Sequence, residues 1–104
     1  MARVAFTMKV FKGCEAEYKK RHSEIWDELR SLLSRTGVTD YSIFLDEETN
    51  ILFAYLVIDD AIKLDELPNE PIMQKWWAHM KDIMETNADN SPKTVSLREV
   101  FHLP

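Results

Sequence analysis

The chain switches between two hydrophobic periods, and this switching narrows its possible folds more than any other feature. Apolar residues alternate over 2–10, 38–46 and 94–103, while residues 51–58 are apolar throughout. A period of two is typical of a half-buried strand, and a short apolar run is typical of a strand covered on both faces. Over 15–36 and 71–84 the apolar residues recur every three or four positions, which predicts amphipathic helices.

Turn-forming residues mark the boundaries between these segments. Gly37 follows the first helix, where glycine is a common C-cap, and Pro71 suits the first turn of the second helix. Polar residues 46–50 predict a hairpin connection, 61–67 a further short helix, and 87–92 a loop. The order β-α-β-β-α-β predicts an α+β fold of the ferredoxin-like type, in which two helices cover one face of an antiparallel sheet.

The third predicted strand is apolar on both of its faces, although helices are expected to cover only one. Its two sets of side chains are Ile51, Phe53, Tyr55 and Val57 on one face and Leu52, Ala54, Leu56 and Ile58 on the other. An uncovered apolar face on a small domain is typical of a partner-binding surface. We therefore expect a homodimer that packs sheet on sheet or joins strands.

Length and charge exclude several classes of function. The 104 residues are expected to form one domain, 1–104, and 13 basic against 18 acidic residues give a net charge of −5. Nucleic acids and anionic membranes bind basic faces, so neither is expected as a partner. The longest uncharged apolar run, 51–58, is much shorter than the roughly 20 residues of a transmembrane helix.

The counts of cysteine, histidine and glycine limit the chemistry further. The single Cys14 cannot form an intramolecular disulfide, which favours a reducing compartment. One cysteine and three scattered histidines lack the spacing of zinc ligands, and two glycines cannot build a phosphate-binding loop. No metal, nucleotide or other cofactor is therefore expected.

His22 is the residue of clearest chemical interest. At about 100° per residue it falls near the centre of the apolar stripe of helix 15–36, one turn from Tyr18. This position favours either a core histidine bonded to a backbone carbonyl or to Tyr18, or a general acid or base on a cavity wall. His79 falls just outside the apolar arc of its helix, where a solvated position is expected, and His102 lies beside the C-terminus.

Two adjacent tryptophans, Trp76 and Trp77, both lie on the apolar arc of the second helix. Neighbouring helical positions point about 100° apart, so the two rings cannot stack on each other. They are either two core aromatics or a wall for a ligand with an apolar C–H face and polar edges, such as a sugar. Tyr18 and Tyr41 add phenolic hydroxyls, and Tyr41 shares a strand face with Ile43 from which its ring can face the helices.

Several segments, taken in order, resemble the L-rhamnose mutarotase family across nearly the whole chain. They are Glu17-Tyr18-x-x-Arg21-His22, Ile25-Trp26-x-Glu28-Leu29, Tyr41-x-Ile43, Leu52-Phe53-Ala54, Trp76-Trp77-x-x-Met80, Asp89-Asn90-Ser91-Pro92 and Glu99-Val100-Phe101-x-Leu103-Pro104. The chain departs from the family at Asp27 and Ala88, where the family often has proline.

The resemblance implies a dimeric ferredoxin-like α/β barrel, a cytoplasmic location, no cofactor, and interconversion of the α and β anomers of L-rhamnose. The family's catalytic histidine, a proton donor, matches His22, and its sugar-contacting positions match Tyr18, Tyr41, Trp76 and Trp77. The group that takes the anomeric proton stays open between water and a tyrosine hydroxyl. Two other functions stay open as well: oxygenase or haem-degrading activity, on fold analogy alone, and a non-catalytic small-ligand or interaction module.

Overall fold

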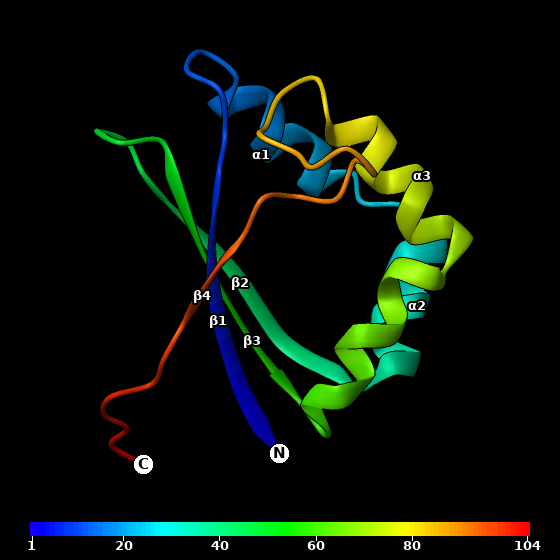
Figure 1. The fold of residues 1–104 in the computed structure, drawn as a ribbon, viewed down its shortest axis with the longest axis vertical. Coiled ribbons are helices and arrows are strands. Elements are labelled where there is room, and N and C mark those ends of the chain that lie inside the picture. Colours follow the sequence, from blue (N-terminus) through cyan, green and yellow to red (C-terminus); the bar gives the residue numbers. More distant parts are fainter.

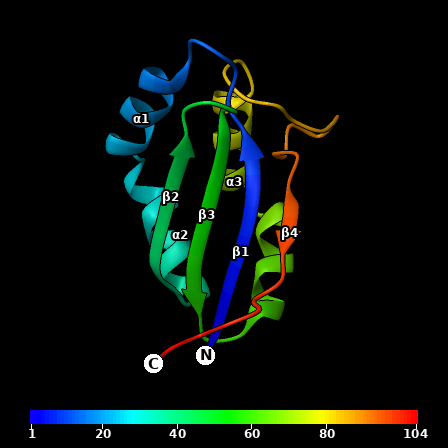
Figure 2. The same ribbon diagram turned by 90° about the vertical axis from the view of Figure 1, so that its left-hand side faces the viewer.

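The computed structural model describes residues 1–104 as two layers, a sheet and a set of helices (Figure 1). The four strands are antiparallel and lie side by side in the order β2-β3-β1-β4 (Figure 2). Their bounds are β1 Ala2–Lys9, β2 Val38–Asp46, β3 Ile51–Ile58 and β4 Val95–Leu97. The predicted α+β class and antiparallel sheet are confirmed.

The helices lie on one side of the sheet (Figure 1). Their bounds are α1 Glu15–Ser23, α2 Asp27–Thr36, the 3₁₀ helix η1 Ala61–Asn69, and α3 Pro71–Met80. The short helix expected after the third strand is η1, and Pro71 begins α3 as predicted. No helix has both the length and the apolar character needed to span a membrane.

The single helix predicted over 15–36 is wrong, because the structure has two helices there. Trp26 adopts an extended conformation, with φ −64° and ψ 138°, and caps the start of α2. Residues 24–26 contain no glycine or proline that would predict this break. Asp27 is the first residue of α2, a position that favours proline, and it is where the resembled family often has one. The departure at Asp27 therefore removed the local signal that would have revealed the break.

The second main helix ends at Met80, four residues before the predicted Met84. A turn then carries the chain back to the end of β1, where the N–H of Phe11 donates to the carbonyl of Ile83 over 2.9 Å. Ile83 and Met84 still belong to the buried core. Their apolar periodicity is therefore real, but it reflects burial in a turn and a bridge to Val10 rather than a continued helix.

The last strand is also shorter than predicted, since β4 covers Val95–Leu97 and not residues 94–103. Past Leu97 a side-chain contact takes the place of the strand ladder. Both Nε and Nη2 of Arg3 donate to the Glu99 carboxylate, over 2.7 and 3.1 Å. The alternation beyond Leu97 thus belongs to an exposed tail with no regular structure.

The two faces of β3 behave as the sequence predicts. Leu52, Ala54, Leu56 and Ile58 are buried beneath the helices. The opposite face has no covering layer (Figure 1), and Phe53 on it is exposed. The chain therefore carries an open apolar face, which consists of outward residues from all four strands.

Gly37 ends α2 with a φ of +98°, and an added Cβ there would collide with the Asp59 carboxylate. Gly37→Ala should lower the free energy of unfolding by about 1–2 kcal/mol for the left-handed backbone, with a small further loss because the exposed Asp59 carboxylate must turn away and weaken its contact with Lys63. Gly13→Ala is the matched control, because Gly13 has a φ of +93° with nothing within 4 Å of its added Cβ. Urea denaturation should show the larger loss for Gly37→Ala; equal losses would contradict a close contact with Asp59.

Candidate active site

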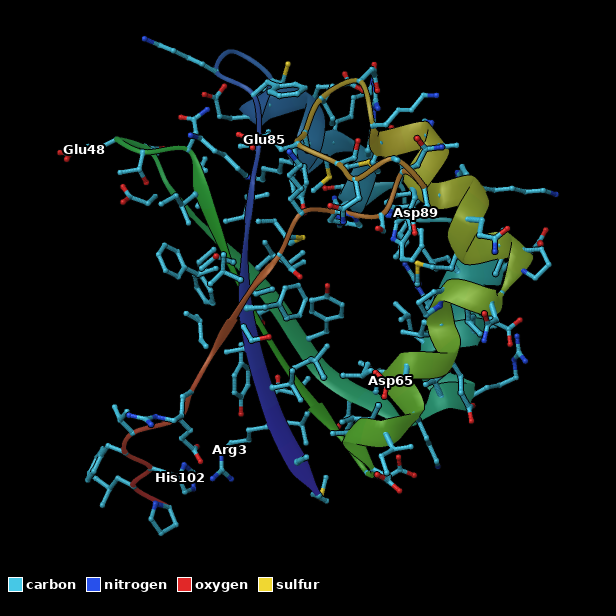
Figure 3. All side chains as sticks on the ribbon, in the orientation of Figure 1. Arg3, Glu48, Asp65, Glu85, Asp89 and His102 are labelled. Atoms are coloured by element: carbon cyan, nitrogen blue, oxygen red, sulfur yellow. The ribbon has the colours of Figure 1, made fainter.

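A cavity of about 1430 Å³ lies between the sheet and the helices. Small-molecule sites usually measure about 300–1,000 Å³, so the space exceeds what one small ligand needs. Figure 3 shows side chains from both layers reaching into this space, with Asp65 of η1 at its edge. All five predicted site residues border the cavity: Tyr18, His22, Tyr41, Trp76 and Trp77.

His22 sits in the last turn of α1 with its ring between two aromatic neighbours. It stacks on Tyr18, with ring centroids 4.3 Å apart, and meets Trp76 edge-on at 5.4 Å. Its Nδ1 lies 3.1 Å from the Tyr18 carbonyl oxygen. A carbonyl only accepts, so Nδ1 carries the proton and, in the neutral ring, Nε2 carries the lone pair. His22 thus makes the backbone bond of a structural histidine and also borders the cavity.

Burial lowers the pKa of His22 below its ordinary 6.5, and the bond to the Tyr18 carbonyl only partly opposes this effect. The imidazole is therefore mainly neutral at pH 7. In this state Nε2 accepts a proton, and once protonated it is a strong donor because the surroundings disfavour the charged ring. This combination suits proton transfer in either direction near neutral pH.

The two tyrosines offer neutral hydroxyls. Burial raises the pKa of Tyr41 to about 12, and burial together with nearby Tyr41 raises the pKa of Tyr18 further. Tyr41 is 39% exposed as a whole residue and borders the cavity. Both phenols stay protonated at neutral pH, so each can donate and accept a hydrogen bond with a polar ligand.

Tyr41 lies on the cavity side of the sheet with Ile43 and Leu45, directly after a bulge in β2. The pairs Thr39–Val57 and Ser42–Tyr55 leave two residues of β2 opposite Leu56 alone. Asp40 is the extra residue, and its φ of +49° accommodates the bend. The predicted inward alternation of Tyr41 with Ile43 is confirmed, and the bulge, which left no signal in the sequence, shifts the alternation only between Val38 and Tyr41.

Trp76 and Trp77 follow one another on α3, with Trp76 buried and Trp77 half-buried. Trp76 also meets the ring of Trp26 edge-on, with centroids 5.1 Å apart. His79 is exposed, as predicted, but the expectation of a merely solvated position was incomplete. Its ring lies 5.3 Å from that of Trp26 and 5.6 Å from that of Trp76. The spacing of three between Trp76 and His79 could have revealed this neighbour on the helix.

Arg21, next to His22, makes contacts that the sequence did not reveal. Its side chain is 15% exposed and bonds to Glu17 on α1 and to two groups beyond α1. The spacing of four between Glu17 and Arg21 predicts the first contact. The other two join positions about 60 apart in the chain, which no local pattern reveals.

The remaining chemical groups lie elsewhere. His102 is on the C-terminal tail, on the side of the sheet away from the helices (Figure 3). Cys14 is a free, partly buried thiol before α1. No group of three or more His, Cys, Asp or Glu side chains is arranged to hold a metal ion.

Comparison with known proteins gives one consistent result. Residues 3–103 match the family model described as L-rhamnose mutarotase. The L-rhamnose mutarotase of Flavobacterium johnsoniae is 61% identical over 101 residues, 97% of this chain and 94% of the relative. That of Jannaschia sp. is 58% identical over 104 residues, the whole of both chains.

Solved structures agree with the sequence relatives. The crystal structure of the L-rhamnose mutarotase from Formosa agariphila is 47% identical and superposes with a TM-score of 0.93 over all of both chains. The Rv0793 protein of Mycobacterium tuberculosis, 12% identical with a TM-score of 0.57 over 98% of this chain and 97% of that one, shares the fold alone. By its family match and its identity to full-length relatives, the chain belongs to the L-rhamnose mutarotase family.

Proposed function

We propose that this protein interconverts the α and β anomers of L-rhamnose by acid–base-assisted opening and closing of the pyranose ring. The observation that carries the proposal is His22, whose bond to the Tyr18 carbonyl leaves Nε2 as the lone-pair nitrogen of a ring that borders an aromatic-walled cavity. The substrate follows from relatives named L-rhamnose mutarotase that match nearly the full chain. This membership also favours a mutarotase over a haem-degrading enzyme or a non-catalytic module.

Anomer exchange requires the ring to open to the aldehyde and to close on the other face of C1. Nε2 of His22 takes the proton of the anomeric hydroxyl, whose electrons form the C1=O double bond as the bond between C1 and the ring oxygen breaks. Nε2 then returns the proton to the ring oxygen, which is the donor role expected of His22. Both sugar oxygens are bonded to C1, so one nitrogen can serve both. A positioned acid–base group contributes about 10²–10⁴-fold.

The four other residues hold the sugar. Tyr18 and Tyr41 bind sugar hydroxyls through phenols that stay neutral. Trp76 and Trp77 cover the C–H face and the methyl end, for which flat indole rings provide apolar surface. These roles agree with the residues that the family resemblance assigns to substrate binding.

Replacement of His22 by Ala should slow anomer exchange about 100-fold or more, because the proton must then pass through water. His102→Ala is the matched control and should keep the parent rate, since His102 lies on the tail outside the cavity (Figure 3). In the parent, the enzymatic rate should fall as the pH drops through the lowered pKa of His22, because protonation removes the lone pair of Nε2.

NMR saturation transfer between the two anomers measures this rate directly, after subtraction of the uncatalysed exchange. L-Rhamnose should be compared with other 6-deoxy and plain aldoses under the same conditions, and circular dichroism should confirm that each variant is folded. Full anomer exchange in a folded His22→Ala protein would rule out the mechanism.

Binding of L-rhamnose should change the tryptophan fluorescence, because Trp76 and Trp77 both border the cavity. At least one of the single variants Trp76→Phe and Trp77→Phe should lose this response. Trp26→Phe is the control, since Trp26 packs on Trp76 without lining the cavity, and it should keep the response. A response that persists in both Trp76→Phe and Trp77→Phe would argue against a shared aromatic site.

We further infer a ferredoxin-like topology and a homodimer. The strand order β2-β3-β1-β4, with helices on one face, supports the topology. The open face supports the dimer, because Phe44 and Phe53 pair across it and are 67% and 41% exposed. A second copy would cover these side chains, and a symmetric contact between identical faces is the commonest solution.

Light scattering should give a mass of about twice 12.2 kDa at micromolar concentration. Phe44→Glu should shift the protein to the monomer mass, because a carboxylate in an apolar interface loses its hydration. Ile62→Glu is the control, since Ile62 is 70% exposed on the helical side, and it should stay dimeric. A parent mass of 12.2 kDa would contradict the dimer.

The cytoplasmic location and the lack of a cofactor are proposals that rest on the family resemblance. The net charge of −5 favours a small-molecule sugar over nucleic acid as the partner. The lack of a cofactor is consistent with proton transfer through the chain's own side chains.

A further inference from the structure

We propose that Arg21 is a positioning residue for His22: by clamping the end of α1 to the end of α3, it fixes the imidazole against Trp76. The proposal rests on the catalytic role proposed above for His22. Arg21 itself does not line the cavity, so it acts through its neighbour rather than on the sugar.

The guanidinium of Arg21 joins three groups. Within α1, its Nε donates to the Glu17 carboxylate over 2.8 Å. Its Nη1 donates to the backbone carbonyl of His79 over 2.6 Å and to Oδ1 of Asp82 over 2.7 Å. Its Nη2 donates to Oδ2 of Asp82 over 3.2 Å. The clamp therefore has one anchor on α1 and two at the C-terminal end of α3.

The geometry of these contacts makes the clamp stiff. Arg21 meets Asp82 with two parallel bonds, which fix direction as well as distance. The His79 carbonyl belongs to the last turn of α3, whose carbonyls have no partner within the helix, so Arg21 satisfies one of them. The bond from Arg21 also holds the pKa of the Asp82 carboxyl below its usual range, which keeps this anchor charged at neutral pH.

The residues joined by the clamp are neighbours of His22 on α1 and of Trp76 on α3. Arg21 and His22 are consecutive residues in the last turn of α1, which ends at Ser23 and does not continue into α2. Trp76 lies one turn before His79 on α3. The rings of His22 and Trp76, with centroids 5.4 Å apart, therefore lie on helix turns that Arg21 joins through its bond to the His79 carbonyl. Loss of the clamp would let the end of α1 shift, and a shift near 1 Å can cost about 100-fold in rate.

Three variants separate positioning from general stability. Arg21→Gln removes both the positive charge and the guanidinium, whereas Arg21→Lys keeps the charge but cannot make the two parallel bonds. Asp82→Asn weakens only the anchor on the α3 side, and because Asp82 is 63% exposed this variant should fold. Lys63→Gln is the control. It breaks the Asp59–Lys63 ion pair, which is 2.8 Å long and has the same four-residue spacing as Glu17–Arg21 but does not join α1 to α3.

Two readouts are needed for each folded variant. Saturation transfer over a range of L-rhamnose concentrations gives kcat and KM, and NMR titration of the imidazole gives the pKa of His22. Arg21→Gln should lower kcat by about 10- to 100-fold with a smaller change in KM. It should also move the pKa of His22 toward 6.5, because the ring leaves its covered position. Arg21→Lys and Asp82→Asn should lie between Arg21→Gln and the parent, and Lys63→Gln should match the parent.

A folded Arg21→Gln protein with kcat near the parent value would overturn the proposal, and so would a lower kcat in that variant with an unchanged pKa of His22. If Arg21→Gln does not fold, Asp82→Asn decides by the same two criteria. The pKa readout does not depend on catalysis. Full activity in His22→Ala would therefore remove the proposed mechanism, while the titration of the Arg21 variants would still show whether the clamp holds the ring.

Discussion

The ring of Trp76 on α3 joins the parts of the helical layer to one another. Its ring meets His22 from α1 and Trp26 from the segment between α1 and α2, each edge-on. Edge-to-face pairs contribute about 0.5–1.5 kcal/mol each beyond their buried area, and they fix the angle between rings. The layer is therefore organised by the directions of a few aromatic rings.

The interior reflects this arrangement, since only 15 of 104 residues are buried. Proteins normally fill their interiors to the density of organic crystals, and atoms that face empty space lose attractive contacts. A chain of this size would gain stability from a filled core, yet a cavity occupies the place between its two layers. The apolar side chains of the interior thus serve two purposes, because residues such as Leu52 and Met80 belong to the buried cluster and also border the cavity.

The sequence predicted most of the fold and singled out five residues that the structure places around one cavity, but it revealed little of what holds them in place. Hydrophobic periods located β1, β2 and β3, since a buried face imposes a local pattern. His22 and Trp76 were recognised because they lie on apolar stripes. The break before α2 was missed. Trp26 is extended there and its ring contacts Trp76 on α3, and no local pattern reveals such a tertiary contact. The contact of Arg21 with Asp82 was hidden for the same reason.

The bulge at Asp40 has a consequence for how such a protein can vary. Side chains on a strand change faces with every residue, so Val38 and Tyr41, three positions apart, share the inward face only because Asp40 is an extra residue between them. Substitutions along β2 can alter the chemistry at the cavity wall while leaving that direction intact. Deletion of Asp40 would remove the bulge and still leave Val38 and Tyr41 on one face, because the two would then be two positions apart. The side of the sheet that carries the Tyr41 hydroxyl is thus set by the register of β2 against β3, and the bulge is a place where the chain can lose a residue without turning Tyr41 outward.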